Sequence, residues 1–179
     1  MKIFYDTEFV EDGSTIALLS IGMVAEDGRE LYAVVDDEEA ITRAVARPWL
    51  LENVIPHLPI KVLPPGQLPG ENWDYDRDHA DWDLIIPRSK VADQVRTFIQ
   101  ATPDAELWAY YAAYDHVALC QLFGRMIDLP PGVPMWTNDL QQEIARRGNP
   151  ALPKQETGEH NALADARWNR AVHDSLYPF

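Results

Sequence analysis

Short apolar runs near the start of the chain predict that it opens with three strands. Residues 2–9 (KIFYDTEF) form a largely apolar stretch, and two further runs of β type follow within residues 14–35. The two later runs are joined at EDGR, where Asp27-Gly28 is a strong hairpin signal. We therefore expect the second and third strands to pair antiparallel.

After residue 35, helical periodicity alternates with short apolar runs. Asp36 or Asp37 is expected to cap the first helix, Pro48 to restart it, Ser89 to cap the second helix and Asn161 the last. Further strands are expected at 105–113 and 133–139. Helices are expected at 36–58, 89–102, 114–127, 140–148 and 160–176.

This order of elements predicts an α/β fold. We expect a mixed sheet, with three antiparallel strands followed by parallel strands, flanked by helices. At 179 residues the chain is expected to be one domain, 1–179. A segment at about 56–83, rich in proline and aromatic residues, interrupts the pattern as an insertion, and a loop of this length is usually functional or mobile.

Composition narrows the class of protein. The only cysteine, Cys120, lies in an apolar helical pattern, so no intrachain disulfide can form, which is typical of a cytoplasmic protein. No run approaches the ~20 apolar residues of a membrane helix, and the first residues lack a signal-peptide pattern. The net charge of −14 argues against a broad basic surface for nucleic acid, unless bound divalent cations reverse the local field.

Two acids interrupt the first apolar run. Asp6 and Glu8 are two residues apart, so on a strand both point to the same face, with no Lys or Arg beside them in the sequence. Paired carboxylates are costly without a cation, and hard oxygen ligands suit Mg²⁺ or Mn²⁺. With 29 acidic residues among 179, however, one Asp-x-Glu triplet is expected from composition alone.

Two later segments add candidate site residues. Asp115 lies where an apolar strand turns into a helix, although an acid in a first helical turn also interacts favourably with the helix dipole. Asp165 lies on the mostly apolar face of the last helix and requires a partner. His160 would be ~140° away from it on a continuous helix, so we expect His160 just before the helix, on a mobile segment after Gly158.

Taken together, these residues resemble a known family. Three motifs occur in order along the chain: Asp6-x-Glu8, then Tyr114-Asp115, then His160-x₄-Asp165. This set resembles the DEDDh 3′→5′ exonucleases, which include RNase T and oligoribonuclease and have an RNase H-like fold. Chain length and the insertion are most similar to small bacterial 3′-exoribonucleases that prefer polyadenylate. One departure is Tyr110, where the family commonly has Asn.

The resemblance implies a mechanism and a substrate. It implies that His160 takes a proton from water and that two Mg²⁺ ions, with Mn²⁺ able to substitute, are held by Asp6, Glu8, Asp115 and Asp165. The implied substrate is single-stranded RNA or an RNA 3′ overhang, hydrolysed to nucleoside 5′-monophosphates, with a preference for adenylate. The related exonucleases are dimeric, so a homodimer is expected.

Substrate contacts and rival functions stay open at this stage. Thr7, Phe9 and Tyr110 are assigned to substrate binding from the motifs. In the insertion, the aromatic residues either fold back onto the domain or a second subunit, or stack on RNA bases beside a cationic phosphate contact; the candidates are Trp73, Tyr75 and Arg77. A DNA 3′→5′ exonuclease, an RNA–DNA hybrid endonuclease and a catalytically silent acidic interaction domain are the alternatives.

Overall fold

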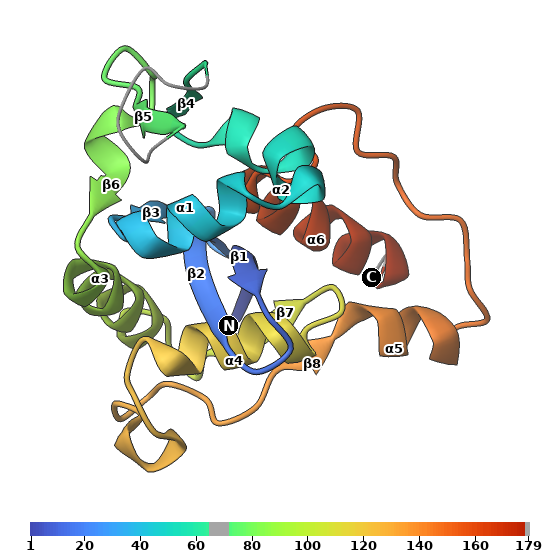
Figure 1. Ribbon diagram of the computed structural model, residues 1–179. Coiled ribbons are helices and arrows are strands. Elements are labelled where there is room, and N and C mark those ends of the chain that lie inside the picture. The colour runs from blue at the N-terminus through green and yellow to red at the C-terminus, as the bar shows by residue number, and fades with distance from the viewer. Residues whose placement is uncertain (65–71, 178–179) are drawn as a thin grey trace.

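The computed structural model describes residues 1–64 and 72–177 (Figure 1). Residues 65–71 of the expected insertion therefore lie outside the described part. The strands are β1 (Lys2–Glu11), β2 (Ile16–Ala25), β3 (Glu30–Val35), β4 (Ile60–Val62), β5 (Trp73–Tyr75), β6 (Ile85–Ile86), β7 (Glu106–Ala109) and β8 (Asn138–Asp139). The α-helices are α1 (Glu38–Val45), α2 (Pro48–Asn53), α3 (Arg88–Gln100), α4 (Ala113–Gln121), α5 (Leu140–Arg146) and α6 (Ala162–Leu176). Short 3₁₀ turns lie at Ile55–His57, Trp82–Leu84 and Met126–Asp128.

Six strands form one mixed sheet in the order β6-β3-β2-β1-β7-β8. The β1–β2 and β2–β3 pairs are antiparallel, whereas β1–β7, β7–β8 and β3–β6 are parallel. This arrangement confirms the predicted mixed sheet, with an antiparallel start followed by parallel strands. In the described ranges no helix has the length and apolar character needed to span a membrane.

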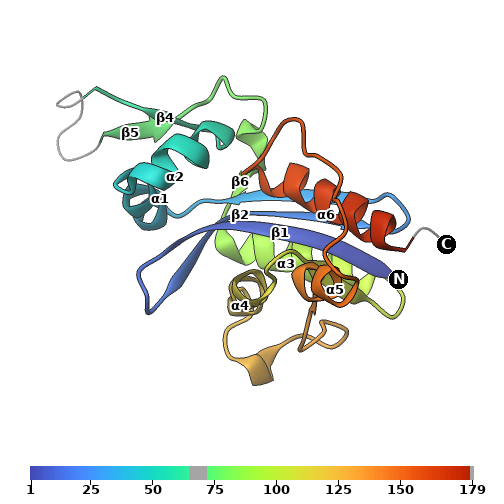
Figure 2. The ribbon, with the colours of Figure 1, turned by 90° about the vertical axis from the view of Figure 1, so that its right-hand side faces the viewer.

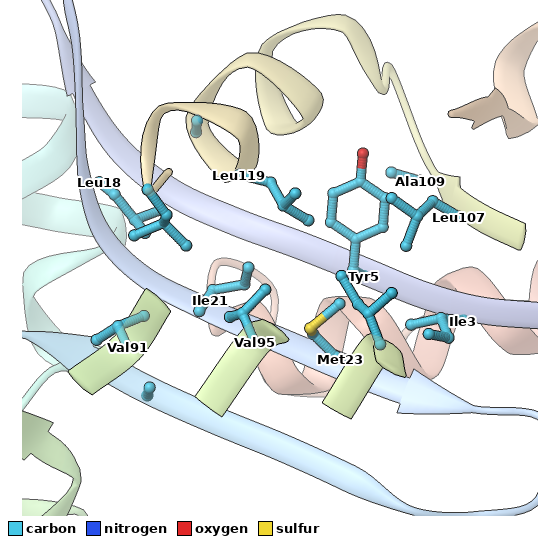
Figure 3. Packing of buried hydrophobic residues seen from close by; sticks show 14 of the residues in the cluster. Ile3, Tyr5, Leu18, Ile21, Met23, Val91, Val95, Leu107, Ala109 and Leu119 are labelled. Atoms are coloured by element: carbon cyan, nitrogen blue, oxygen red, sulfur yellow. The ribbon is translucent and has the colours of Figure 1, made fainter. Parts of the chain in front are cut away.

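The side chains of β1 alternate between two cores. Ile3 and Tyr5 face α3 and α4, where they pack in one cluster with Val95 and Leu119 (Figure 3). Phe4 belongs to a second cluster, formed with residues of α5 and α6. Figure 2 shows α1, α2 and α6 on one side of the sheet and α3 and α4 on the other. By this alternation, the acids that follow Phe4 at every second position face the α6 side.

The start of α6 is seated directly on β2. A Cβ atom at Gly22 would lie 2.3 Å from the carbonyl carbon and oxygen of Ala162, so only glycine allows this approach. Asn161 caps the helix as predicted, because its Oδ1 accepts a 3.1 Å hydrogen bond from the Ala164 N–H. The helix start is therefore fixed against the sheet at one backbone-to-backbone contact.

The middle of the chain differs from the prediction. β7 ends at Ala109 rather than at residue 113, because Tyr111 has a positive φ of 54° and α4 begins at Ala113. α4 ends at Gln121 rather than at residue 127, before Gly124 with its φ of 96°. The expected strand at 133–139 is reduced to the two residues of β8.

Three further expectations about single residues or short elements were wrong or incomplete. Met126 falls within the expected helix 114–127, but it lies beyond α4 in a 3₁₀ turn and is 61% exposed. Ser89 does not cap α3, because the helix starts at Arg88 and the cap position is Pro87, which offers no side-chain hydrogen bond. Strand β6 and the small β4–β5 sheet were not predicted.

Candidate active site

The four predicted acids and His160 line a single pocket of about 830 Å³. Asp6 and Glu8 lie on β1, Asp115 lies in the first turn of α4, and His160 and Asp165 lie at the start of α6. Three segments that are far apart in the sequence thus meet at one end of the sheet. The register shifts between Glu8 and Phe9, where Leu19 of β2 is the extra, unpaired residue; such a β-bulge is often found next to active sites.

Asp115 reaches the site through an open strand edge. The pairing of β1 with β7 ends at Phe4, so beyond that residue the edge of β1 has no strand partner on the β7 side among residues 1–64 and 72–177. Asp115 Oδ1 takes this place, accepting hydrogen bonds from the Thr7 backbone N–H (2.9 Å) and the Thr7 Oγ1 hydroxyl (2.7 Å). The early end of β7 therefore makes room for the third carboxylate.

Asp165 is held by the segment that precedes α6. Its Oδ1 accepts a 2.6 Å hydrogen bond from Gln155 Nε2, and its Oδ2 accepts a 2.8 Å bond from the His160 backbone N–H. Gln155 was not predicted as a site residue, since no motif in the sequence marks it. The two bonds tie the loop that carries His160 to the helix that carries Asp165.

His160 lies just before α6, as predicted, and faces the acids from there. Its φ of 66° is left-handed, which directs the side chain away from the helical path. One ligand atom each of Glu8, His160 and Asp165 lie within 4.8 Å of one another. The indole of Trp49 meets the imidazole edge-on, with ring centroids 4.8 Å apart at 75°. Trp49 is therefore a further site residue, which sequence motifs did not reveal.

Burial raises the pKa of all four carboxyl groups, and repulsion by the other acids of the site adds to this effect for Asp6 and Glu8. Burial is the largest cause for Asp6, whose pKa is well above its usual value, followed by the charges of Asp115 and Glu8. Burial, then the charges of Asp165 and Asp115, raise the pKa of Glu8 to about 8. Burial raises the pKa of Asp115 to about 6 against the opposing effect of the Thr7 hydrogen bonds, and also raises the pKa of Asp165.

This cluster has the chemistry of a divalent-cation site. Within residues 1–64 and 72–177, no Lys or Arg forms an ion pair with any of the four carboxylates. Uncompensated charge of this kind is stabilised when a cation binds, and carboxylate oxygens are the ligands that Mg²⁺ and Mn²⁺ prefer. The donor set therefore fits such ions.

The aromatic residues of the insertion lie outside the acidic pocket. Of the alternatives for this segment, Trp73 folds back onto the domain, because it is 4% exposed and donates a 2.9 Å hydrogen bond from Nε1 to Thr42 Oγ1. The Tyr75 hydroxyl donates to Asp36, and the Arg77 guanidinium lies over the Trp82 ring. None of the three predicted contacts in this segment, Trp73, Tyr75 and Arg77, lines the acidic pocket.

Of the other predicted substrate contacts, two line the acidic pocket and one lies in a neighbouring pocket. Phe9 lines the pocket and stacks on Tyr114, with ring centroids 6.1 Å apart at 15°. Thr7 lines it as well, but its side chain is buried and bonded to Asp115. Tyr110 lies in an adjoining pocket of about 300 Å³, where it packs against Trp168.

Sequence comparison identifies the family. Residues 1–176 match the family model described as the 3′-5′ exoribonuclease Rv2179c-like domain. The chain belongs to this family. The Rv2179c-like assignment confirms the predicted class of enzyme, a nuclease that hydrolyses phosphodiester bonds. Two curated relatives are 44% identical over 172 residues, which cover 93% of this chain and 88% of each relative: 3′-5′ exoribonuclease Rv2179c of Mycobacterium tuberculosis strain H37Rv and 3′-5′ exoribonuclease MT2234.1 of strain CDC 1551.

Structural comparison supports the fold of this Rv2179c-like chain. S. pombe Pop2p, solved in a form with Mg²⁺ and Mn²⁺ bound, superposes with a TM-score of 0.50 at 12% sequence identity. The superposition covers 98% of this chain and 82% of Pop2p. At this level of identity the likeness concerns the arrangement of the sheet and helices alone.

Proposed function

We propose that the protein degrades single-stranded RNA or RNA 3′ overhangs from the 3′ end and releases nucleoside 5′-monophosphates by a two-metal-ion mechanism. The convergence of four carboxylates and a histidine in one pocket carries this proposal. The residues that would hold the two ions are Asp6, Glu8, Asp115 and Asp165. The Rv2179c-like family, with its 3′-5′ exoribonucleases, supplies the direction and the substrate.

The proposed ions are Mg²⁺, with Mn²⁺ able to substitute. The all-oxygen donor set and the raised pKa of the carboxyl groups favour hard divalent cations, and both ions are named for the Pop2p structure. When bound, such a pair of ions lowers the pKa of a water and neutralises charge on the attacking and leaving oxygens. The same ions would reconcile an acidic pocket with a polyanionic substrate.

The protein side chains supply proton transfer and positioning. His160 faces Glu8 and Asp165 and acts as the general base that accepts the proton of the attacking water. Its backbone N–H bond to Asp165 and the edge of Trp49 hold it in place. Thr7 orients Asp115, and the stacked rings of Phe9 and Tyr114 form an apolar wall against which a nucleobase can stack.

Three finer assignments rest on the resemblance to small bacterial exoribonucleases and on composition. The preference for adenylate and the homodimer follow from the resemblance alone. A cytoplasmic location is supported by the single cysteine, Cys120, which leaves no intrachain disulfide. Comparing homopolymers of the four ribonucleotides and measuring the mass in solution test the first two.

A time course on 5′-labelled single-stranded RNA and DNA, with Mg²⁺, Mn²⁺ or EDTA, tests the function. We expect a ladder that shortens stepwise from the 3′ end of RNA, mononucleotide products, and no hydrolysis in EDTA. The Asp6→Asn variant should be inactive while remaining folded. Internal cuts in an RNA–DNA hybrid would indicate the endonuclease instead, and the absence of metal-stimulated hydrolysis would indicate an interaction domain.

A further inference from the structure

The acidic pocket extends well beyond the candidate metal ligands. It follows β1 from Asp6 past the end of the strand to Gly13 in the β1–β2 turn. A strand rises roughly 3.4 Å per residue, so the pocket is longer than a single bound nucleotide. The wall opposite the turn is the start of α2, with Arg47, Trp49 and Leu50.

Arg47 is the only Lys or Arg among the described residues that line this pocket, and six carboxylates line it as well. The two carboxylates nearest the turn already have partners. Asp12 accepts hydrogen bonds from the Ser14 and Thr15 backbone N–H groups, at 2.9 Å and 2.8 Å, and pairs with Arg43 at 3.1 Å. Glu11 accepts a 2.6 Å bond from the Gly13 N–H.

The guanidinium of Arg47 is available for an anion. Arg47 is exposed at the N-cap position of α2, and its backbone N–H bonds to the Ala44 carbonyl. Within residues 1–64 and 72–177, its side chain makes no ion pair and no hydrogen bond. An arginine left unpaired in an acidic pocket suits a ligand that brings its own negative charge, and the guanidinium fork matches a phosphate.

The position of Arg47 along the chain places it between the two ends of the pocket. Arg43, four residues earlier, contacts Asp12 in the β1–β2 turn. Trp49, two residues later, contacts His160 at the catalytic end. Arg47 therefore lies beside the path that leads from the candidate metal ligands toward the turn.

We propose that Arg47 binds a backbone phosphate of the RNA on the 5′ side of the scissile bond. This inference rests on the proposed exoribonuclease function and adds a substrate contact to it. The scissile phosphate lies with the metal ligands, so the next phosphates of a chain entering the pocket pass the start of α2. The contact is independent of base identity, because a phosphate carries no sequence information.

Steady-state hydrolysis of an RNA octamer by Arg47→Gln, over a series of salt concentrations, tests the proposal. We expect KM to rise about tenfold, the size of one lost charged hydrogen bond. The slope of log KM against log salt should fall by about 0.7, the value for one phosphate contact in a single strand. Arg47→Lys, which keeps the charge, should recover much of the loss. Arg96→Gln makes the same change in net charge on α3, where Arg96 pairs with Asp93, and serves as the control.

Substrate length then separates the scissile phosphate from the upstream phosphates. A dinucleotide has only the scissile phosphate, so Arg47→Gln should reduce the preference of the enzyme for the octamer over the dinucleotide. An unchanged salt slope together with an unchanged octamer preference would overturn the inference, and so would an equal effect from Arg96→Gln. If the wild-type protein itself fails to hydrolyse RNA, the proposed function fails instead.

Discussion

Thr7 donates two hydrogen bonds to one oxygen of Asp115, from its backbone N–H at 2.9 Å and from its hydroxyl at 2.7 Å. The two residues are 108 positions apart in the sequence. Thr7 lies between Asp6 and Glu8, so the strand that carries two of the acids also orients the third. Three of the four carboxylates therefore share one rigid support.

We expect Thr7→Val to weaken metal binding while keeping the shape of the side chain. The hydroxyl bond to Asp115 is lost, and removing such a supporting bond typically costs about 10–100-fold in metal affinity or activity. Isothermal titration with Mn²⁺ measures the change. Thr7→Ser keeps the hydroxyl and should bind Mn²⁺ close to the wild-type affinity. Equal affinities for the Val and Ser variants would show that the bond does not position Asp115.

The metal-free protein should lose stability as the pH rises. The pKa of Glu8 is raised to about 8 and that of Asp115 to about 6, whereas the ordinary values are 4.5 and 3.8. Between about pH 4 and pH 8 the folded state therefore binds more protons than the unfolded state, so the free energy of unfolding falls with rising pH. Urea denaturation in EDTA at pH 6, 7 and 8 measures this slope.

Glu8→Gln isolates the contribution of one carboxyl group. The variant has no charge to lose at position 8, so its metal-free stability should decline less between pH 6 and pH 8 than that of the wild type. Added Mg²⁺ should stabilise the wild type most at pH 8, where competition from protons is weakest. Parallel slopes for wild type and variant would contradict the assignment of the raised pKa to Glu8.

His160→Asn should lower kcat by about 10²–10⁴-fold with little loss of stability. Asparagine tolerates the left-handed backbone at this position, where φ is 66°, so the loop should keep its conformation. Single-turnover hydrolysis measures the rate, and Mn²⁺ titration checks the site. A parallel loss of Mn²⁺ affinity would identify His160 as a metal ligand rather than as the base.

Gly22→Ala should reduce both stability and activity. The added Cβ would meet the backbone of Ala162 at 2.3 Å, so α6 must shift on the sheet, at a cost of about 1–3 kcal/mol. That shift moves His160 and Asp165 relative to β1. Val95→Ala, in the core on the other side of the sheet, is the control with a comparable loss of stability and should keep its kcat. Full activity of Gly22→Ala would show that the site adapts to the shift.

The acids and the histidine singled out from the sequence do line one pocket, whereas several of the contacts around them were not predicted. The acids and His160 could be chosen as candidate site residues because charged residues interrupt apolar runs there. These interruptions lie at the ends of strands and helices. Asp115 was expected where an apolar strand turns into a helix, and it is buried in the first turn of α4. Such local signals depend only on neighbouring residues, so they remain readable without a structure.

The contacts that support the site could not be predicted in this way. Gln155 contacts Asp165, and Trp49 contacts His160. Neither Gln155 nor Trp49 belongs to a sequence motif or a periodic pattern. Trp73 was a candidate for base stacking, and its polar neighbours in the sequence did not indicate that its indole packs in the core between α1 and the small β4–β5 sheet. Its burial is a property of tertiary packing and has no period in the sequence.

The open edge of β1 beyond Phe4 also matters for the behaviour of the protein at high concentration. An uncovered strand edge is a template on which another chain can add a strand, and a buried negative charge at that edge discourages it. Asp115 covers the Thr7 N–H at this edge. The start of α4 therefore protects this edge from the addition of a strand of another molecule. A substitution of Asp115 that keeps the fold should make the protein more prone to aggregate.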